Sequence, residues 1–383
     1  MSERAGDTIS NVIQLKDLTV IIREIGEKYN SDMLAIMDRA PMQSKAIDLL
    51  TDRAPSIFYV PDFYYDEYQY YGFFVGEELH GFAMLSIKQS LVNGEPQAVF
   101  QFTDYYLDHS LRGRNLYYLS GPFIYGQLPT DCKVGYGIFL KGNLPIRSIA
   151  KRTAKKMAHV PLTRVISDLQ IYSIFLLFRK KMPSGYDIRQ AKQSDITEIV
   201  KLLAREHAKR LFGKHVSIES FTKELEQTPD LAIENYYLVR QDNVIVGIAA
   251  IWDTNSFNKI KVTKYGVAYR IVRLFHTGVA KAFGFHPLPA EGEHIRSLFV
   301  RDIVIKDRNP DLLHALLVNI YNNYRSKHYH VINVGMVKGD PLQKSFKHFL
   351  HEVVESQLVL GVFNPLELDD IMTNNPFIEF GVL

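Results

Sequence analysis

The sequence of 383 residues contains a single cysteine, Cys132, and a single tryptophan. One cysteine excludes an internal disulfide framework and any zinc or iron–sulfur site built from several cysteines, so we expect no metal cofactor. The longest apolar run, 171–178, is interrupted by Ser173 and is far shorter than the about 20 residues that span a bilayer. No apolar segment typical of a secretory signal follows the first residues. These absences predict a cytoplasmic protein without a membrane span.

Neither sign of charge dominates the sequence, because 45 lysine and arginine residues stand against 42 aspartate and glutamate residues. The formal net charge is only +3, which argues against nucleic acid as a partner, since dedicated nucleic-acid-binding proteins carry a clear basic excess. Apolar residues make up 46% and charged residues 23% of the chain, as in ordinary globular proteins. The length is sufficient for two or three domains, each with its own core.

A polar segment at 179–185 divides the chain into halves of nearly equal length. It contains Pro183 and Gly185, which interrupt regular structure, and it predicts domains at 1–182 and 183–383. Both halves present the same order of expected elements: a strand, a helix, an antiparallel meander, and a further strand that leads into a helix. This order is typical of an α+β fold in which a mixed, mostly antiparallel sheet is flanked by helices.

Hydrophobic periodicity and turn residues define the expected elements. The dipeptide at 93–94, Asn-Gly, is a strong hairpin signal, and Ser194 and Asp195 form an expected helix cap. In the first half we expect strands at 18–24, 70–75, 80–87, 97–108 and 134–140 and a helix at 31–39; in the second half we expect strands at 186–189, 236–240, 244–252 and 298–305 and helices that begin at 196, 218 and 310.

The segment 103–114, TDYYLDHSLRGR, contains the most specific pattern of the chain. A strand that ends at Leu107 is followed by Arg-Gly-Arg at 112–114, which opens a helix. This pattern resembles the strand and phosphate loop of the GCN5-related N-acetyltransferases (GNAT). Residues 188–191 together with Asp195 resemble the beginning of a second such domain. The chain is thus similar to tandem GNAT proteins over nearly its whole length, which implies the acyl-CoA N-acyltransferase fold in both halves.

The chemistry of coenzyme A agrees with this resemblance. Its pyrophosphate needs N–H donors and a positive potential, and a helix N-terminus supplies both. Arg112 and Arg114 can add charge-assisted hydrogen bonds, and Gly113 lets the backbone approach closely. Asn115 can replace one glycine of the motif because asparagine tolerates the left-handed conformation, and Leu116 then begins the helix. We therefore expect these five residues to bind the cofactor.

The resemblance also implies where the pantetheine arm lies. The strand at 97–108 should splay from the strand at 134–140, so that its free edge pairs with the arm as an added strand would. We expect this pairing at Leu107 and Asp108. Asn143 follows the second strand and either hydrogen-bonds the pantetheine or caps a following helix.

The corresponding loop of the second half lacks these features. Asn309 is expected to cap a helix whose first residue is Pro310. Proline supplies no N–H, and Asp307 and Asp311 add negative charge where a pyrophosphate would lie. We therefore expect acetyl-CoA or another acyl-CoA to bind the first domain, and the second domain to carry a degenerate phosphate loop.

Acyl transfer to an amine needs a base for the ammonium and an acid for the departing thiolate. Asp104, in the middle of a strand, is the candidate base, because a partly buried carboxylate accepts a proton more readily. The alternative is a structural carboxylate that caps a neighbouring loop. Tyr105 and Tyr106 are expected on opposite faces of the strand, one in the core and the other lining an acceptor cleft. The tyrosine acid that the resemblance implies is absent from 143–156.

Two further segments leave alternatives open. Ten tyrosine and phenylalanine residues fall within 58–74, either as a strand that packs into the core or as a wall for an apolar acceptor or a long acyl chain. The segment 258–292 is an insertion relative to a minimal GNAT domain. It is basic and aromatic and contains no acid before Glu291. It is either a solvated face over a buried stripe or a surface for CoA phosphates, nucleic acid or a membrane.

The sequence as a whole predicts an N-acyltransferase of the GNAT type. In the predicted reaction, a primary amine of a small molecule or peptide attacks acyl-CoA directly and takes its acyl group, which is acetyl or another. Two alternatives stay open. One is a non-catalytic acyl-CoA-binding or protein-interaction module of the same fold, and the other is a Fem-type aminoacyl transferase that uses aminoacyl-tRNA, for which the basic insertion is the support.

Overall fold

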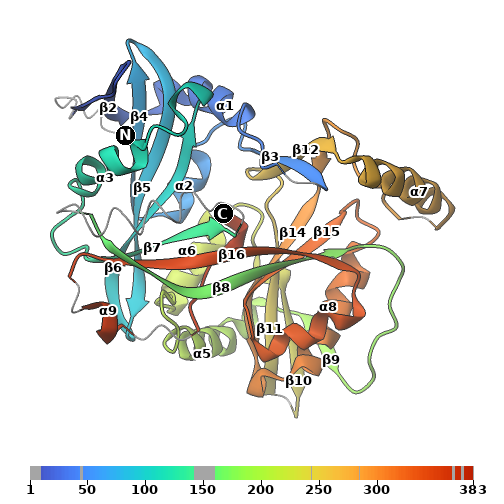
Figure 1. Cartoon of the computed structure of the whole chain (residues 1–383). Helices are drawn as coiled ribbons and strands as arrows, with labels where there is room; N and C mark the ends of the chain where they lie inside the picture. Colours follow the sequence, from blue (N-terminus) through green and yellow to red (C-terminus); the bar gives the residue numbers. More distant parts are fainter. Residues whose placement is uncertain are drawn as a thin grey trace.

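Two lobes share one continuous sheet in the computed structural model of the chain, which describes residues 10–43, 46–141, 160–242, 244–283, 285–364, 367–371 and 375–382 (Figure 1). The first lobe contains strands β1 (Ser10–Gln14), β2 (Thr19–Ile25), β4 (Glu67–Val75), β5 (Glu78–Val92), β6 (Glu95–Leu107) and β7 (Val134–Leu140). The second lobe contains β9 (Asp187–Gln190), β10 (Tyr236–Gln241), β11 (Val244–Asp253), β14 (Ser297–Ile305) and β15 (Val331–Val337). Strands β8 (Leu162–Phe175) and β16 (His351–Val362) lie between the lobes.

The two lobes exchange strands where they meet. The 13 strands follow the order β1-β2-β4-β5-β6-β7-β16-β8-β15-β14-β11-β10-β9. Strand β16, near the end of the chain, pairs with β7 of the first lobe, whereas β8, which precedes the second lobe in sequence, pairs with β15. Figure 1 shows these two long strands crossing the middle of the molecule. Neither lobe therefore has a free sheet edge at the junction.

The expected fold class is confirmed. Within the described ranges, the neighbouring strands of the large sheet are antiparallel except for β6 with β7 and β14 with β15. Each parallel pair lies at the same place in its lobe, which gives two GNAT-like repeats. The boundary expected after residue 182 falls between β8 and β9. The division into 1–182 and 183–383 stays a prediction, because β16 completes the sheet of the first lobe.

Helices cover both faces of each lobe. In the first lobe, α3 (Leu116–Tyr125) packs on one face and α1 (Asn30–Asp38) packs on the other, whereas α2 (Tyr59–Tyr64) packs through Val60 and Phe63 against the core of the second lobe. In the second lobe, α8 (Pro310–Tyr324) covers one face, and α5 (Ile196–His207) and α6 (Ile218–Gln227) cover the other. The short helix α9 (Glu367–Asp370) follows β16. Burial of these apolar helix faces against the sheet is the main stabilising contribution.

The aromatic segment 58–74 differs from the expected strand in its first part. Residues 59–64 form α2, and Pro61 is tolerated there because it lies in the first turn of the helix. The strand begins only at Glu67. Tyr70 and Phe74 are almost fully buried, so most of these rings form core.

The basic insertion forms an arm outside the large sheet. Strand β12 (Lys259–Tyr265) pairs with β13 (His294–Ile295) and with β3 (Ile47–Asp52) of the first half, and it leads into α7 (Val267–Phe283). Figure 1 shows α7 at the periphery of the molecule, beside this small sheet. None of the helices in the described ranges is long and apolar enough to cross a membrane.

Candidate functional site

The two central strands of the first lobe separate after a short parallel pairing. β6 and β7 pair only from Val99 to Gln101, and beyond this point they diverge. A buried hydrogen-bond chain marks the separation: Tyr65 OH donates to Gln101 Oε1 at 3.2 Å, and Gln101 Nε2 donates to Tyr136 OH at 2.6 Å. The expected splay between these strands is therefore present, and beyond Gln101 no strand of the described ranges pairs with this edge of β6.

A β-bulge lies in β6 on this free edge. Thr103 pairs with Met84 and Tyr106 pairs with Phe82. The two residues of β6 between these pairs therefore face a single residue of β5. The first of them, Asp104, has a φ of +49°, a left-handed value that few residues other than glycine adopt. Bulges redirect side chains and are common next to active sites.

The Asp104 carboxylate is held by two buried partners. Arg53 Nη1 donates to Asp104 Oδ2 at 2.7 Å, and the two side chains are only 6% and 8% exposed. Tyr70 OH donates to the same oxygen at 2.8 Å. Desolvation opposes the charge of Arg53, but the neighbouring Asp104 outweighs it, so the pKa of the guanidinium is raised. Burial and the charge of Asp104 raise the pKa of Tyr70.

Tyr105 and Tyr106 lie on opposite faces of the sheet, as strand alternation predicts. Tyr105 packs on the α3 face, with ring contacts to Phe73 and Tyr117, and burial raises the pKa of its hydroxyl. Tyr106 packs on the face that holds Asp104, against Phe82 at 5.3 Å between ring centroids. Burial, and next the charge of Asp104, raise the pKa of Tyr106 to about 12, so both hydroxyls stay protonated at neutral pH.

The end of β6 is partly engaged by the loop that follows. Leu107 O accepts a hydrogen bond from Arg112 Nε at 2.9 Å, and Asp108 N donates to His80 O at 2.7 Å. The Asp108 amide therefore points to β5 and away from the free edge. The Asp108 carboxylate pairs with Arg39 at 3.0 Å and accepts from the Ser110 amide at 3.3 Å. Desolvation opposes its charge, but these partners outweigh it and lower the pKa of Asp108.

The 112–114 loop is exposed and open. Gly113 has a φ of +75°, and no atom lies within 4 Å of the position that a Cβ would occupy. Arg112 is exposed, and Arg114 forms an ion pair with Asp17 at the surface. The loop therefore combines two cationic side chains with a backbone that a ligand can approach closely.

Helix α3 begins directly after this loop. Asn115 adopts the left-handed conformation, with φ 59° and ψ 25°, which asparagine tolerates better than most residues. The Leu116 side chain is buried, so only its backbone faces the loop. Within the described part of the chain, no protein acceptor is bonded to the amides of residues 113–117. The helix continues through Pro122 to Tyr125. Asn143 lies outside the described residues.

An aromatic chamber opens where β6 and β7 separate. Its walls come from both strands, from α3 and from β16. Its cavity is small, about 30 Å³, and Gly137 and Gly361 line it; a Cβ on Gly361 would lie 3.4 Å from Pro161 and 3.6 Å from the Phe100 ring. The remaining lining is almost entirely apolar: Phe100, Phe102, Tyr117, Tyr125, Tyr136, Phe139, Pro161, Thr163 and Val359.

The second lobe repeats the bulge. In β14, Arg301 pairs with Ala250 and Val304 with Ile248, and the intervening Asp302 has a φ of +51°. Its carboxylate accepts a hydrogen bond from Tyr236 OH at 2.8 Å, just as Asp104 accepts one from Tyr70. Desolvation opposes the charge of Asp302, but the nearby cations outweigh it and hold its pKa well below the usual range.

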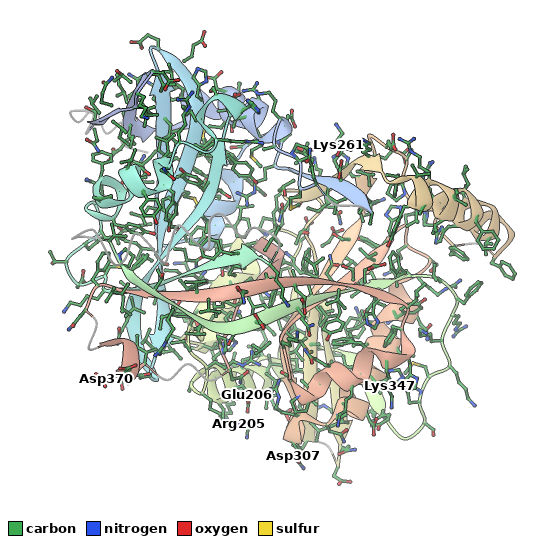
Figure 2. All side chains as sticks on the ribbon, in the orientation of Figure 1. Arg205, Glu206, Lys261, Asp307, Lys347 and Asp370 are labelled. Atoms are coloured by element: carbon green, nitrogen blue, oxygen red, sulfur yellow. The ribbon has the colours of Figure 1, made fainter. Side chains whose placement is uncertain are left out.

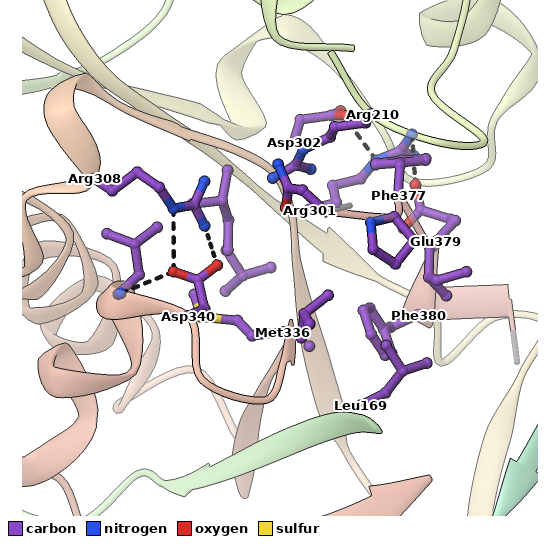
Figure 3. Close-up of a pocket in the computed structure, with 18 residues that line it drawn as sticks. Leu169, Arg210, Arg301, Asp302, Arg308, Met336, Asp340, Phe377, Glu379 and Phe380 are labelled. Atoms are coloured by element: carbon purple, nitrogen blue, oxygen red, sulfur yellow. Dashed lines mark hydrogen bonds and ion pairs between the residues drawn. The ribbon is translucent and has the colours of Figure 1, made fainter. Parts of the chain in front are cut away.

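The splay of the second lobe is closed by the C-terminal segment 376–382. The Phe380 ring lies against Gly335 of β15 so closely that a Cβ there would overlap it, and Glu379 pairs with the buried Arg301 at 3.0 Å. Figure 3 shows these side chains around the small remaining cavity, where Arg308 is bonded to Asp340. At the adjoining loop, Asn309 caps α8 and Pro310 is its first residue, as the sequence predicts.

Three residues at the first-lobe site carry no clear sequence signal. Arg53 is separated from Asp104 by 51 positions, and nothing in its local pattern points to a buried ion pair. Gln101 is one polar residue in an apolar strand, which is a weak signal for a buried hydrogen bond. Gly361 lies in the exchanged strand β16, so its place in the chamber depends on the topology alone.

The strand order and the paired splays are those of the acyl-CoA N-acyltransferase fold. No protein-family model matches the sequence, and no curated protein matches it. Solved structures of Saccharomyces cerevisiae N-myristoyltransferase with bound myristoyl-CoA are similar. One has a TM-score of 0.58 and 10% identity, and the match covers 96% of this chain and 87% of the yeast chain. Another has a TM-score of 0.56 and 11% identity, and the match covers 93% of this chain and 85% of the yeast chain. A GCN5-related N-acetyltransferase from Sphaerobacter thermophilus matches with a TM-score of 0.48 and 11% identity, over 77% of this chain and 81% of that one.

Proposed function

We propose that the protein is an acyl-CoA-dependent N-acyltransferase whose cofactor binds the splay of the first lobe. The observation that carries this proposal is the contrast between the two splays. The second is filled by the C-terminal segment 376–382, whereas the first borders an aromatic chamber and the exposed loop at 112–114. The free amides at the start of α3, with Arg112 and Arg114, suit a pyrophosphate. The acceptor is a primary amine of a small molecule or peptide.

In the proposed reaction the neutral amine attacks the thioester carbonyl. A C–N bond forms, the C–S bond breaks, the nitrogen loses a proton and the CoA thiolate gains one. Asp104 is the proposed base. The bonds from Arg53 and Tyr70 both reach Oδ2, which leaves Oδ1 as the oxygen that could take the proton. Tyr106 lies on the same face of the sheet as Asp104, and Tyr105 lies on the α3 face. Both hydroxyls keep the proton that a general acid needs.

The proposed acyl group extends into the aromatic chamber. An acyl chain that entered the chamber would gain apolar contacts with Phe102 and Tyr125. The similar yeast structures contain myristoyl-CoA, which supports acyl-CoA as the co-substrate. Among the acyl-CoA donors that the sequence leaves open, we therefore propose those with longer chains.

One observation favours a second function, a non-catalytic acyl-CoA-binding module. Arg53 and Tyr70 both bond the buried Asp104 carboxylate, an arrangement that also suits a structural carboxylate. In this case the splay would bind the cofactor without turnover.

Calorimetric titration with CoA, acetyl-CoA and myristoyl-CoA tests the cofactor site. We expect the wild-type protein to bind, and the double variant Arg112→Ala with Arg114→Ala to bind at least about tenfold more weakly, since each arginine supplies a charge-assisted hydrogen bond. The matched control is Lys306→Ala, an exposed cation in the corresponding loop of the second lobe, which should bind as the wild type does. Absence of binding by the wild type would exclude the proposal.

A thiol-release assay with peptide and small-molecule amines then separates the two functions. Release of CoA that depends on the amine supports the transferase. Tight binding of acyl-CoA without release across the amines tested supports the binding module.

A further inference from the structure

Helix α7 presents its apolar side to solvent. At 100° per residue, Val267, Ile271, Leu274 and Phe275 fall on one side of the helix, and their side chains are 78, 66, 69 and 76% exposed. An ordinary surface helix buries this side against the core. Figure 2, in the orientation of Figure 1, shows the arm at the edge of the molecule, with Lys261 labelled on its small sheet.

The opposite side of α7 is the one that contacts the protein, and it is largely polar. Arg273 Nε donates to Pro289 O at 2.9 Å, and His276 Nδ1 accepts from the Leu288 amide at 3.3 Å. Tyr269 OH donates to Glu352 Oε1 at 3.3 Å. The polar contacts fix the orientation of the helix, so its exposed apolar side is a property of the folded arm.

The charge carried by the arm segment itself has one sign. The segment 258–290 contains six lysine and arginine residues and no aspartate or glutamate. Lys264, just before the helix, is exposed, and Arg270, within its first turn, is exposed and pairs with Glu291 at 3.2 Å. An apolar face with exposed aromatic rings and flanking cations is complementary to the headgroups and upper acyl chains of an anionic lipid surface.

We infer that α7 is an interfacial helix whose apolar side inserts into the surface of an anionic lipid bilayer. It lies in the plane of the surface, with its polar side still attached to the arm. The inference does not depend on the proposed acyl transfer. A second copy of the chain fits the same side less well, because two such arms would bring cations together in a like-charge contact.

The arm is connected to the first-lobe site. Strand β12, which leads into α7, pairs with β3, and Arg53 follows the last residue of β3. A second contact reinforces this link, since His294 Nε2 lies 2.7 Å from Asp52 Oδ2. A bilayer bound by α7 would therefore lie close to the segment that supplies the partner of Asp104.

Sedimentation with vesicles tests the inference. We expect the full chain to sediment with vesicles of phosphatidylcholine and phosphatidylserine, and much less with phosphatidylcholine alone. The double variant Leu274→Glu with Phe275→Glu should lose binding by at least about tenfold, because it removes inserted apolar groups and adds negative charge. Both residues are exposed, so folding should be unchanged in circular dichroism.

The matched control carries the same charge change elsewhere. Val12 on β1 and Val244 on β11 are exposed and lie outside the arm. The double variant Val12→Glu with Val244→Glu should bind vesicles as the wild type does. Absence of wild-type binding to the anionic vesicles, equal loss in both double variants, or full binding by the α7 variant would overturn the inference. A wild-type dimer in sedimentation velocity that the α7 variant abolishes, without vesicle binding, would identify a second copy as the occupant.

Discussion

Asp104 and Asp302 occupy equivalent positions in the two lobes. Each begins the bulge of the strand that borders a splay, with φ values of +49° and +51°, and each accepts a hydrogen bond from a buried tyrosine hydroxyl at 2.8 Å. The surroundings of the two bulges differ. Asp104 forms a buried pair with Arg53 beside the first splay, whereas Asp302 belongs to a buried ionic cluster with Lys214, Arg301 and Glu224, beside the C-terminal segment. The same local geometry is therefore placed in two chemical settings.

The first prediction separates the roles of the two aspartates. Asp302→Asn should lower the free energy of unfolding by about 3 kcal/mol, because it leaves buried cations without their partner. It should leave the affinity for acyl-CoA unchanged. Asp104→Asn should lower turnover while the affinity for acyl-CoA stays within about twofold of the wild type, as expected for a base that does not hold the cofactor. Urea unfolding, calorimetric titration and thiol release measure these three quantities.

The outcomes that would contradict this assignment are specific. Turnover of Asp104→Asn equal to that of the wild type would remove Asp104 from the mechanism. Loss of acyl-CoA binding in a folded Asp302→Asn protein would mean that the second lobe takes part in binding the cofactor.

A second prediction concerns the aromatic chamber. Gly361→Val places a branched side chain next to Pro161 and Phe100, both of which line the chamber. The affinity for myristoyl-CoA should fall at least about tenfold, because several methylene contacts are lost, whereas the affinity for CoA itself should not change. Gly361→Ala adds only one carbon and should have an intermediate effect. Titration of both variants with CoA and myristoyl-CoA measures the difference, and equal losses for the two ligands would show that the acyl chain lies elsewhere.

Local sequence patterns predicted the elements that build the first-lobe site. The Asn-Gly turn at 93–94 gave the hairpin between β5 and β6, the apolar run gave β7 at 134–140, and Asn115 has the predicted left-handed conformation. The pattern could not predict that Arg53 would meet Asp104, because this contact is set by how separate elements pack. The strand exchange of β8 and β16 is non-local for the same reason, since strand partners are not encoded in the period of one segment.

The C-terminal segment shows the same limit. Residues 376–382 contain no helix or strand period, so the sequence gives no reason to place them in the core. Their burial follows from the shape of the second splay, where Gly335 leaves the space that the Phe380 ring fills. Pro310 as the first residue of α8 could be predicted from the sequence, whereas the burial of residues 376–382 in the second splay could not.

A third prediction follows from the half-buried His330. Burial lowers its pKa to about 4, and the nearby His286 is the next cause. An unfolded histidine has a pKa of about 6.5, so the unfolded state takes up the proton first as the pH falls. The contribution of neutral His330 to the free energy of unfolding is therefore complete above about pH 6.5 and is lost as the pH falls to about 4. This contribution amounts to up to about 3 kcal/mol.

The variant His330→Gln removes this titration. Its free energy of unfolding should fall less than that of the wild type between about pH 7 and about pH 4.5, as measured by urea unfolding. Other histidines titrate in both proteins, so the comparison rests on the difference between them. Parallel pH profiles would exclude His330 as a source of the acid sensitivity.

The last prediction tests whether the C-terminal segment fills the second splay in solution. Phe380→Ala should lower the free energy of unfolding by about 3 kcal/mol, because it leaves a cavity beside β15. Gly335→Val should also destabilise the protein, since its Cβ would overlap the Phe380 ring. The two substitutions remove the same contact, so the double variant should be at least about 1 kcal/mol more stable than the sum of the single effects. Urea unfolding of the four proteins gives this coupling. Additive effects would mean that the ring and the glycine do not meet, and the second splay would then be open to a ligand.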